Sequence, residues 1–235
     1  MAATSIMTLF RRSELVLLIY FGYASGVSLF LDLPHPVVIA TAIVNLTVLT
    51  GYFLLAFFER RSPGTALGTI RDWLPIPLML LCYREMGWFA PAEHTYELER
   101  GWVVWDKLLL HHWGLRDAIE AAGPLLPSIL EISYALTYTL GAFSMAMLYF
   151  YRRRESADRF LFVLLLSALL SYALFPYFPS EPPRTVFPGQ DMPRIDTVFR
   201  QFNWWLLSRG GIHTSVFPSA HVSSAFGAAF GLLLV

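Results

Sequence analysis

The chain has little charge and little cysteine, and each shortage excludes a class of protein. Charged residues make up only 14% of the 235 residues, against about 25% in a typical soluble domain. The formal net charge is zero, so nothing in the sequence indicates a nucleic-acid partner. The single cysteine, Cys82, excludes an intrachain disulfide. These shortages rule out a disulfide scaffold and a basic nucleic-acid-binding domain.

Apolar residues are abundant instead, at 56% of the chain, and they gather in runs near the roughly twenty residues that cross a bilayer. The sequence therefore predicts an all-α, polytopic transmembrane helical bundle of about six spans, in one membrane-embedded domain over residues 1–235. The last run is too short to cross, so we expect this span to be clipped and the domain to be C-terminally incomplete. The expected spans are Leu15–Leu31, Pro36–Phe58, Trp73–Ala90, Leu125–Phe150, Phe160–Phe178 and Val222–Val235.

Arginines lie in alternate connections between these spans. The positive-inside rule places those connections on the cytoplasmic side. The segment Pro179–Ala220 then falls on the opposite, extracytoplasmic side. We expect an integral protein of the plasma (inner) membrane with its active site on that side. The arginines are Arg11, Arg12, Arg60, Arg61, Arg71, Arg152, Arg153, Arg154 and Arg159.

The stretch from Phe217 to His221 places a hydroxyl and an imidazole two residues apart at a predicted helix N-terminus. Unpaired backbone N–H groups and the helix dipole favour an anion there. Ser219 is suited to hold a phosphoryl oxygen and His221 to donate a proton. Taken singly, each residue also fits a plain role, Ser219 as a helix cap and His221 as a histidine bonded to a neighbouring carbonyl.

Arg184 stands upstream of this element on the same predicted face, in a loop stiffened by Pro179, Pro182 and Pro183. A guanidinium offers planar, forked donors that suit two phosphate oxygens. An isolated arginine in such a loop is more often a solvated or headgroup-contacting residue. Paired with Ser219 and His221, it favours a phosphate site.

Three stretches of sequence resemble the first two signature blocks of the type-2 phosphatidic acid phosphatase superfamily: Pro182-Pro183-Arg184, Asp196-Thr197-Val198 and Phe217-Pro218-Ser219-Ala220-His221-Val222. The branch that contains inositol-phosphorylceramide synthases and their bacterial relatives is the most similar, through Arg71-Asp72-Trp73-Leu74-Pro75 and the Tyr134/Tyr138 region. The resemblance covers most of the chain. Tyr177 stands where the superfamily usually has a lysine ahead of the arginine.

The resemblance implies an integral membrane lipid-phosphate phosphatase or phosphotransferase that works through a phosphohistidine, without metal or organic cofactor. Arg184 and Ser219 would bind phosphate, and His221 would be the general acid. The attacking histidine belongs to a third block that these 235 residues lack, and we expect it beyond Val235. The acceptor, water or an alcohol, stays open. The alternative from another class is a catalytically inactive, lipid-phosphate-binding membrane protein.

The remaining histidines and membrane-depth charges carry weaker expectations. His213 could line the pocket, because Gly210 and Gly211 give its loop freedom to approach a ligand. His111 and His112 fit interfacial residues. No spacing of histidine, cysteine or carboxylate predicts a metal site. Charges within the apolar runs usually find partners inside the bundle, so we expect a buried structural pair; these charges are Arg84, Glu85 and Glu131.

Overall fold

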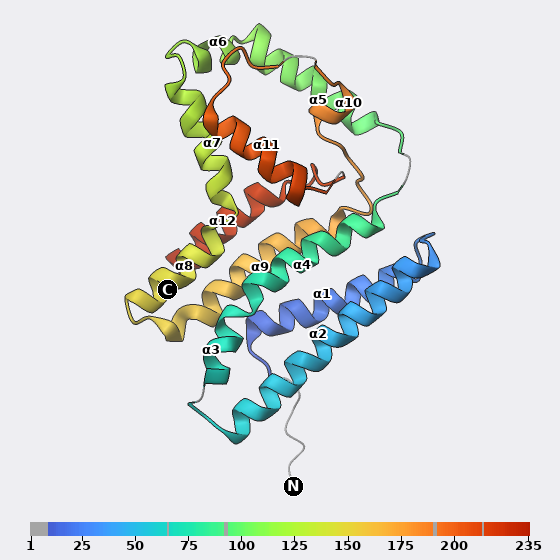
Figure 1. The fold of residues 1–235 in the computed structure, drawn as a ribbon, viewed down its shortest axis with the longest axis vertical. Coiled ribbons are helices and arrows are strands. Elements are labelled where there is room, and N and C mark those ends of the chain that lie inside the picture. Colours follow the sequence, from blue (N-terminus) through green and yellow to red (C-terminus); the bar gives the residue numbers. More distant parts are fainter. Residues whose placement is uncertain (1–8, 65, 92–93, 190–191, 213) are drawn as a thin grey trace.

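The computed structural model describes residues 9–64, 66–91, 94–189, 192–212 and 214–235. Every regular element in this part of the chain is a helix, which confirms the expected all-α class (Figure 1). In chain order the elements are α1 (Arg12–Ser28), α2 (His35–Arg61), α3 (Ala66–Trp73), α4 (Pro75–Met86), η2 (Gly87–Phe89), α5 (Glu97–Lys107), η3 (Leu108–His112), α6 (Leu115–Glu120), α7 (Leu125–Thr137), α8 (Leu140–Phe150), η4 (Arg154–Ser156), α9 (Ala157–Leu174), α10 (Pro183–Val186), α11 (Val198–Gly210) and α12 (Ala220–Leu233).

Helix α9 forms the centre of the bundle because apolar residues occupy nearly all of its sequence. Phe160 and Leu165 are fully buried, and Leu161 and Leu164 are only 1% exposed. Helices α1, α4 and α12 pack around it, with α12 making the most extensive contact. The position of α12 is therefore set by α9.

Two glycines allow α12 to approach α9 closely. A Cβ atom added at Gly227 would lie 2.8 Å from Cβ of Ser167, and one added at Gly231 would lie 2.9 Å from Cδ2 of Phe160. Both distances are shorter than real side-chain contacts, so only glycine fits at this separation. Small residues are the usual means of close helix packing in apolar bundles.

A second group of helices lies beside the bundle, in the upper half of Figure 1. It consists of α5, η3, α6, α7 and α11, and α7 connects it to the bundle through contacts with α12. The loop between α9 and α10 and the loop between α11 and α12 touch each other, since the Val216 N–H donates to the Ser180 carbonyl at 3.4 Å. These two loops carry the residues expected to bind phosphate.

The six expected spans are not all present as long helices. Two helices of the described chain are long and apolar enough to cross a membrane, namely α2 and the helix over Arg154–Leu174. Three shorter apolar helices, α7, α8 and α12, have between 10 and 17 residues. The two long helices are compatible with a membrane protein.

Two expected spans are each divided. The run Trp73–Ala90 contains the last residue of α3, then α4 from Pro75, which lacks the N–H that would continue α3, and then the separate 3-10 helix η2. The run Leu125–Phe150 is broken between α7 and α8. There the Thr137 and Thr139 hydroxyls donate to backbone carbonyls three residues upstream, at 2.7 and 2.9 Å. Such side-chain bonds compete with regular helical bonding.

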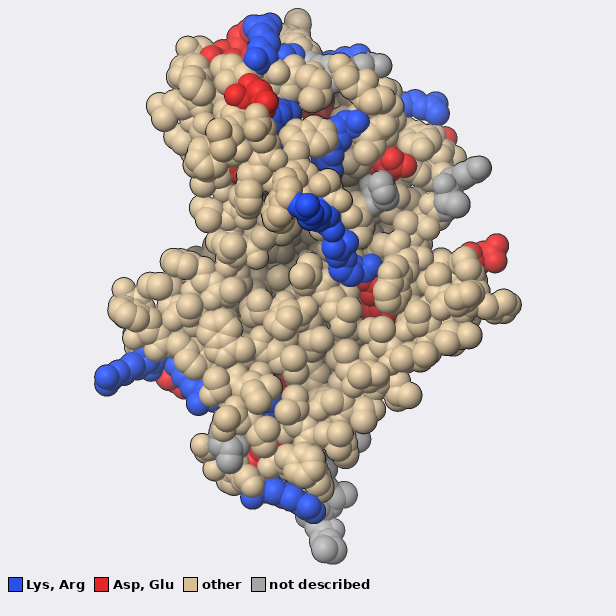
Figure 2. All heavy atoms as spheres, viewed as in Figure 1, with Lys and Arg blue, Asp and Glu red and all other residues tan. Residues whose placement is uncertain are grey.

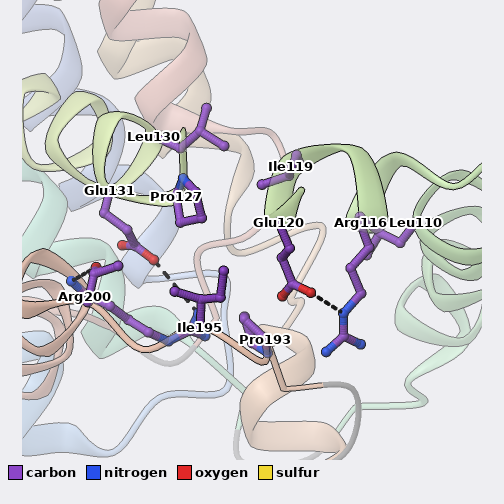
Figure 3. A pocket seen from close by; sticks show the side chains of 11 residues that line it. Leu110, Arg116, Ile119, Glu120, Pro127, Leu130, Glu131, Pro193, Ile195 and Arg200 are labelled. Atoms are coloured by element: carbon purple, nitrogen blue, oxygen red, sulfur yellow. Dashed lines mark hydrogen bonds and ion pairs between the residues drawn. The ribbon is translucent and has the colours of Figure 1, made fainter. Parts of the chain in front are cut away.

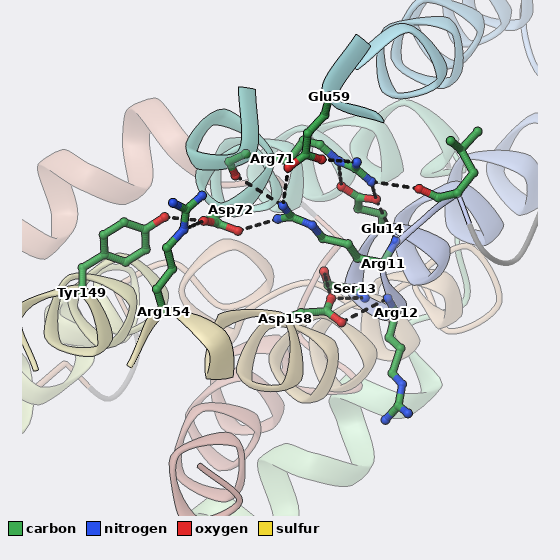
Figure 4. A network of polar contacts seen from close by, with 12 residues as sticks. Arg11, Arg12, Ser13, Glu14, Glu59, Arg71, Asp72, Tyr149, Arg154 and Asp158 are labelled. Atoms are coloured by element: carbon green, nitrogen blue, oxygen red, sulfur yellow. Dashed lines mark hydrogen bonds and ion pairs between the residues drawn. The ribbon is translucent and has the colours of Figure 1, made fainter. Parts of the chain in front are cut away.

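A network of ion pairs joins the N-terminal helices to η4 (Figure 4). It contains three arginines and three carboxylates: Arg11, Arg71, Arg154, Glu14, Glu59 and Asp72. Glu14 is fully buried and accepts from Nε of Arg71 at 2.7 Å. At the other end, Arg154 Nε lies 2.6 Å from Oδ2 of Asp72. Pairing on this scale is what lets carboxylates be buried at all.

The outer surface is largely apolar. In Figure 2 charged side chains gather mainly towards the two ends of the view, and most of the area between is tan, apart from a blue stripe near the middle and a few red side chains beside it and at the right edge. On α2 alone, Ile39, Ile43 and Leu46 are each at least 59% exposed. Exposed apolar area of this extent marks a surface that contacts something other than water.

Candidate active site

Helix α12 begins where the sequence predicts, directly after Ser219. Ser219 is its N-cap, with its Oγ accepting the Val222 N–H at 3.4 Å, and His221 lies in the first turn. The Ser219 side chain is exposed, so its hydroxyl can contact a ligand as well as the cap. The backbone N–H groups of this first turn point the same way. The helix end therefore offers a serine hydroxyl and backbone donors to an anion.

His221 lies between two tyrosines of α7 and the turn that follows it. Its ring stacks on Tyr134, with centroids 4.7 Å apart and planes 23° apart, and meets Tyr138 edge-on at 5.0 Å. Its Nε2 atom is buried and has no hydrogen-bond partner among the described residues. Burial lowers the pKa of His221, which lies just ahead of the apolar run Val222–Val235. The two tyrosines thus fix the orientation of the ring, and its buried Nε2 atom is unpaired among the described residues.

Arg184 lies in the short helix α10, whose start is fixed by Pro182 and Pro183. Its guanidinium is exposed and sits 5.8 Å from the ring centroid of Trp204. Both side chains line a cavity of about 300 Å³, together with Pro182, Pro183, Glu131, Tyr134, Met192, Arg200, Asn203 and Leu207. The residue that links this cavity to His221 is Tyr134, which lines the cavity and also stacks on the imidazole. The structure thus brings Arg184 and His221 to one tyrosine, while Ser219 is not part of the lining.

The loop that carries Arg184 is held by Ser180, which is fully buried. Ser180 Oγ accepts the Phe217 N–H at 3.0 Å, which attaches this loop to the one that carries Ser219 and His221. The aromatic rings of Phe178 and Phe217 meet edge-on at 5.8 Å beside this contact. The spacing between the two sequence blocks is therefore set by direct bonds.

Glu99 of α5 holds the same loop from the other side. It is 2% exposed, and its Oε1 accepts the Glu181 N–H at 2.7 Å and contacts His94 Nε2 at 2.8 Å. Burial alone would raise the pKa of Glu99, but these two contacts outweigh it and the pKa is lowered. Glu99 therefore stays charged and fixes the backbone three residues before Arg184.

A second, smaller cavity of about 190 Å³ is shown in Figure 3. It adjoins the first, since Glu131 and Arg200 line both. Glu131 accepts from Nδ2 of Asn203 at 2.6 Å and lies 3.9 Å from Arg200. The expected pairing of Glu131 inside the protein is thus seen, with Asn203 as its closest partner. Apolar side chains form most of the remaining wall: Leu110, Ile119, Pro127, Leu130, Pro193 and Ile195.

Other expected residues lie elsewhere. His213 is outside the described residues. His111 and His112 belong to η3 and line neither cavity as described. Arg84 and Glu85 do not pair with each other: Arg84 is exposed and donates to the Arg209 carbonyl at 2.8 Å, whereas Glu85 is fully buried. The expectation of a buried Arg84–Glu85 pair is wrong, because adjacent residues on a helix point to different faces.

Several residues of this site carry no signal in the sequence. Glu99 and Ser180 lie 82 and 37 residues from the residues they bind, and nothing in their local spacing predicts those contacts. Arg200 and Asn203 fall on one face of α11, three residues apart, but their target Glu131 is on α7. The sequence points to Tyr134 only through the family resemblance.

A family model described as PAP2 superfamily matches residues 103–235, more than half of the chain. The match contains both loops of the site and the tyrosines of α7, and leaves α1 to α4 outside. Comparison with curated proteins and with solved structures gives no match.

Proposed function

Because the chain belongs to the PAP2 superfamily, we propose that it is an integral membrane enzyme that transfers the phosphoryl group of a lipid phosphate ester. Superfamily membership suggests phosphatase-type activity. The observation that carries the proposal is Tyr134, which lines the cavity of Arg184 and stacks on His221. A phosphate bound by Arg184 then lies beside a histidine able to give a proton to the oxygen that leaves.

The division of labour follows from the chemistry of each group. The Arg184 fork binds two phosphoryl oxygens, and the first turn of α12 with Ser219 stabilises charge on the others. As the bond from phosphorus to the lipid oxygen breaks, His221 transfers its Nε2 proton to that oxygen and the lipid leaves as an alcohol. Catalysis by positioning and charge suits phosphoryl transfer, which needs little covalent chemistry from the protein. In the phosphohistidine route the attacking imidazole comes from a third block that these residues do not contain.

For the acceptor, we favour an alcohol over water. The second cavity adjoins the first through Glu131 and Arg200, which gives space for another substrate beside the phosphate. Its carboxylates and arginines can bond hydroxyl groups, and its apolar wall can exclude water. This supports placement in the branch that resembles inositol-phosphorylceramide synthases. Phosphorylated polyol formed when a polyol is added would support transfer, whereas equal phosphate release with and without the polyol would favour hydrolysis.

The membrane proposed is the plasma (inner) membrane, with both site loops on the extracytoplasmic side. The support is the distribution of arginines along the sequence, together with the apolar outer surface.

Substitution of Arg184 tests the site most directly. Vanadate, an analogue of transferring phosphate, should quench the fluorescence of Trp204, which lines the same cavity. Arg184→Lys should weaken vanadate binding by at least about tenfold, the effect of losing roughly 1.4 kcal/mol, because an ammonium cannot form the planar two-oxygen contact. Arg209→Lys is the matched control, since Arg209 packs on Trp205 and does not line the cavity as described. Equal binding by Arg184→Lys and the wild type would refute a bidentate role.

A further inference from the structure

Glu85 is a buried carboxylate without a counter-ion in the N-terminal half of the chain. Its side chain is 0% exposed, and neither carboxyl oxygen has a hydrogen-bond partner among the described residues. The neighbouring arginine, Arg84, points outward. An isolated ionised carboxylate is strongly unfavourable in such surroundings, and it must take up a proton or a cation to be stable.

Asn45 of α2 supplies a second unpartnered oxygen close to Glu85. Its Nδ2 donates to the Phe21 carbonyl at 3.2 Å and to Ser25 Oγ at 2.9 Å, both on α1. These bonds fix the orientation of the amide, so its Oδ1 must point the other way, and that oxygen is buried without a partner. The Asn45 side chain lies against the Glu85 carboxyl group. An amide oxygen and a carboxylate are both acceptors, so they cannot bond to each other directly.

The groups around this pair are neutral in their ordinary states. Those that interact with Glu85 are Tyr20 on α1 and Cys82 on α4. Tyr20 already donates its hydroxyl to the Cys82 carbonyl at 3.2 Å, which removes one available donor. Thr41, one turn from Asn45 on the same helix, adds another buried oxygen without a partner. Among the described residues, these surroundings thus offer neutral polar groups and one carboxyl group without a counter-ion.

We propose that Glu85 and Asn45 form a binding site for a single positive charge, a proton or a sodium ion, between α1, α2 and α4. A proton taken from solvent would form an O–H bond on Glu85 that donates to Asn45 Oδ1, which satisfies two orphan oxygens at once. A sodium ion would be held by the same oxygens. These residues lie outside the region matched by the family, 103–235, so the site is independent of the proposed phosphoryl transfer.

The proposal predicts how stability depends on the medium. Because the site binds its proton or sodium ion only in the folded protein, the free energy of unfolding rises with the concentration of that ion. The Tm of the full chain in detergent should rise by at least about 3 °C from pH 8.5 to pH 6 in choline chloride if the charge is a proton. If sodium binds, replacing choline by sodium should raise Tm most at pH 8.5, where protons compete least.

Glu85→Gln is the decisive variant, because its amide N–H can donate to Asn45 Oδ1 without any bound charge. It should lose the response to pH or sodium and have a Tm equal to or above that of wild type at pH 8.5. Asp106→Asn, which removes an exposed carboxylate on α5, should keep the full response. An equal response in wild type and Glu85→Gln, or a Glu85→Gln protein destabilised at every pH, would overturn the proposal.

A spectroscopic measurement on wild type does not depend on how the glutamine variant folds. Infrared spectra of the protein in the proton-bound state should contain the C=O band of a protonated carboxyl group, and Asn45→Ala should shift that band. If sodium binds at the same site, adding sodium at constant pH should displace the proton and remove this band. A carboxylate band insensitive to pH, to sodium and to Asn45→Ala would exclude the site.

Discussion

Glu99 shows how one buried side chain can act on a site to which it contributes no ligand. Its carboxylate holds the Glu181 N–H, three residues before Arg184, and a charged acceptor makes this bond stronger than a neutral one. Glu99→Gln should therefore weaken vanadate binding by about tenfold or more, in line with the roughly 1.5–3 kcal/mol of a hydrogen bond to a charged group. Trp204 fluorescence gives the measurement. The matched control is Glu97→Gln, an exposed glutamate on the same helix, and a Glu99→Gln protein that binds like this control would contradict the clamp.

The lowered pKa of Glu99 also makes the stability of the protein depend on pH. The pKa of Glu99 in the folded protein lies below that of an ordinary glutamate, so the stabilisation from Glu99 is present above the ordinary pKa and is lost as the pH falls through the folded pKa. As the pH is lowered, Tm should thus fall less in Glu99→Gln than in wild type. Identical acid profiles would show that the contact contributes no net stability.

His221 owes its lowered pKa to burial against Tyr134 and Tyr138. A general acid must be protonated, so activity falls as the pH rises through its pKa. Because the pKa of His221 is lowered, this fall should come at a lower pH than for an exposed histidine. Tyr134→Ala exposes the ring and should raise the pKa of His221, and with it the pH up to which the imidazole can donate a proton. NMR titration of His221 measures the same shift without turnover. Tyr134→Phe retains the stacked ring and should leave the titration in place; a shift of the same size in both variants would assign it to the tyrosine hydroxyl.

At the scale of elements, the start of α12 was predictable and its neighbours were not. Serine followed by an apolar run is a local signal, because the cap bond joins residues three positions apart. The break between α7 and α8 follows from threonine hydroxyls within an otherwise apolar run, a signal that hydrophobicity masks. The contact of Glu99 with Glu181 joins positions 82 residues apart, and only the packing of α5 beside α10 brings them together. Likewise, nothing in the sequence of α4 indicates that Arg84 points outward and leaves Glu85 unpaired.

The contact of α12 with α9 sets where His221 stands, and Gly227 is its tightest point. A methyl group there would lie 2.7 Å from Ser167 Oγ and 3.3 Å from the Leu164 Cα, which is backbone and cannot rotate away. Gly227→Ala should therefore destabilise the protein by about 1–3 kcal/mol, in spite of the better helix propensity of alanine. A thermal melt should show Tm lower by at least about 2 °C. Gly51→Ala, on a helix with open space around it, should be neutral or stabilising, and the idea of close packing fails if the two variants behave alike.

For the whole molecule, the arginines used to orient the chain have two roles. Arg11, Arg71 and Arg154 are engaged with carboxylates in the ion network, so much of their charge is offset by Glu14, Glu59 and Asp72. The positive-inside rule counts lysines and arginines rather than net charge, so the pairing leaves the predicted orientation unchanged. The same network joins α1, α2, α3 and η4 at one end of the bundle, and the phosphate loops lie near the other helix ends (Figures 1 and 4). If the bundle crosses a membrane, these two ends face different compartments.

Single cysteines can test this orientation, because Cys82 is fully buried and can be replaced by alanine to give a background without thiols. Ser208→Cys places an exposed thiol on α11 beside the site loops, and Glu155→Cys places one on η4 beside the ion network. In intact cells a membrane-impermeant thiol reagent should label Ser208→Cys and spare Glu155→Cys, since only the first faces outward under the proposed topology. After lysis both should react equally, which controls for thiol reactivity. Labelling of both variants in intact cells would contradict a membrane barrier between them. Labelling of Glu155→Cys alone would invert the orientation and place phosphoryl transfer on the cytoplasmic side.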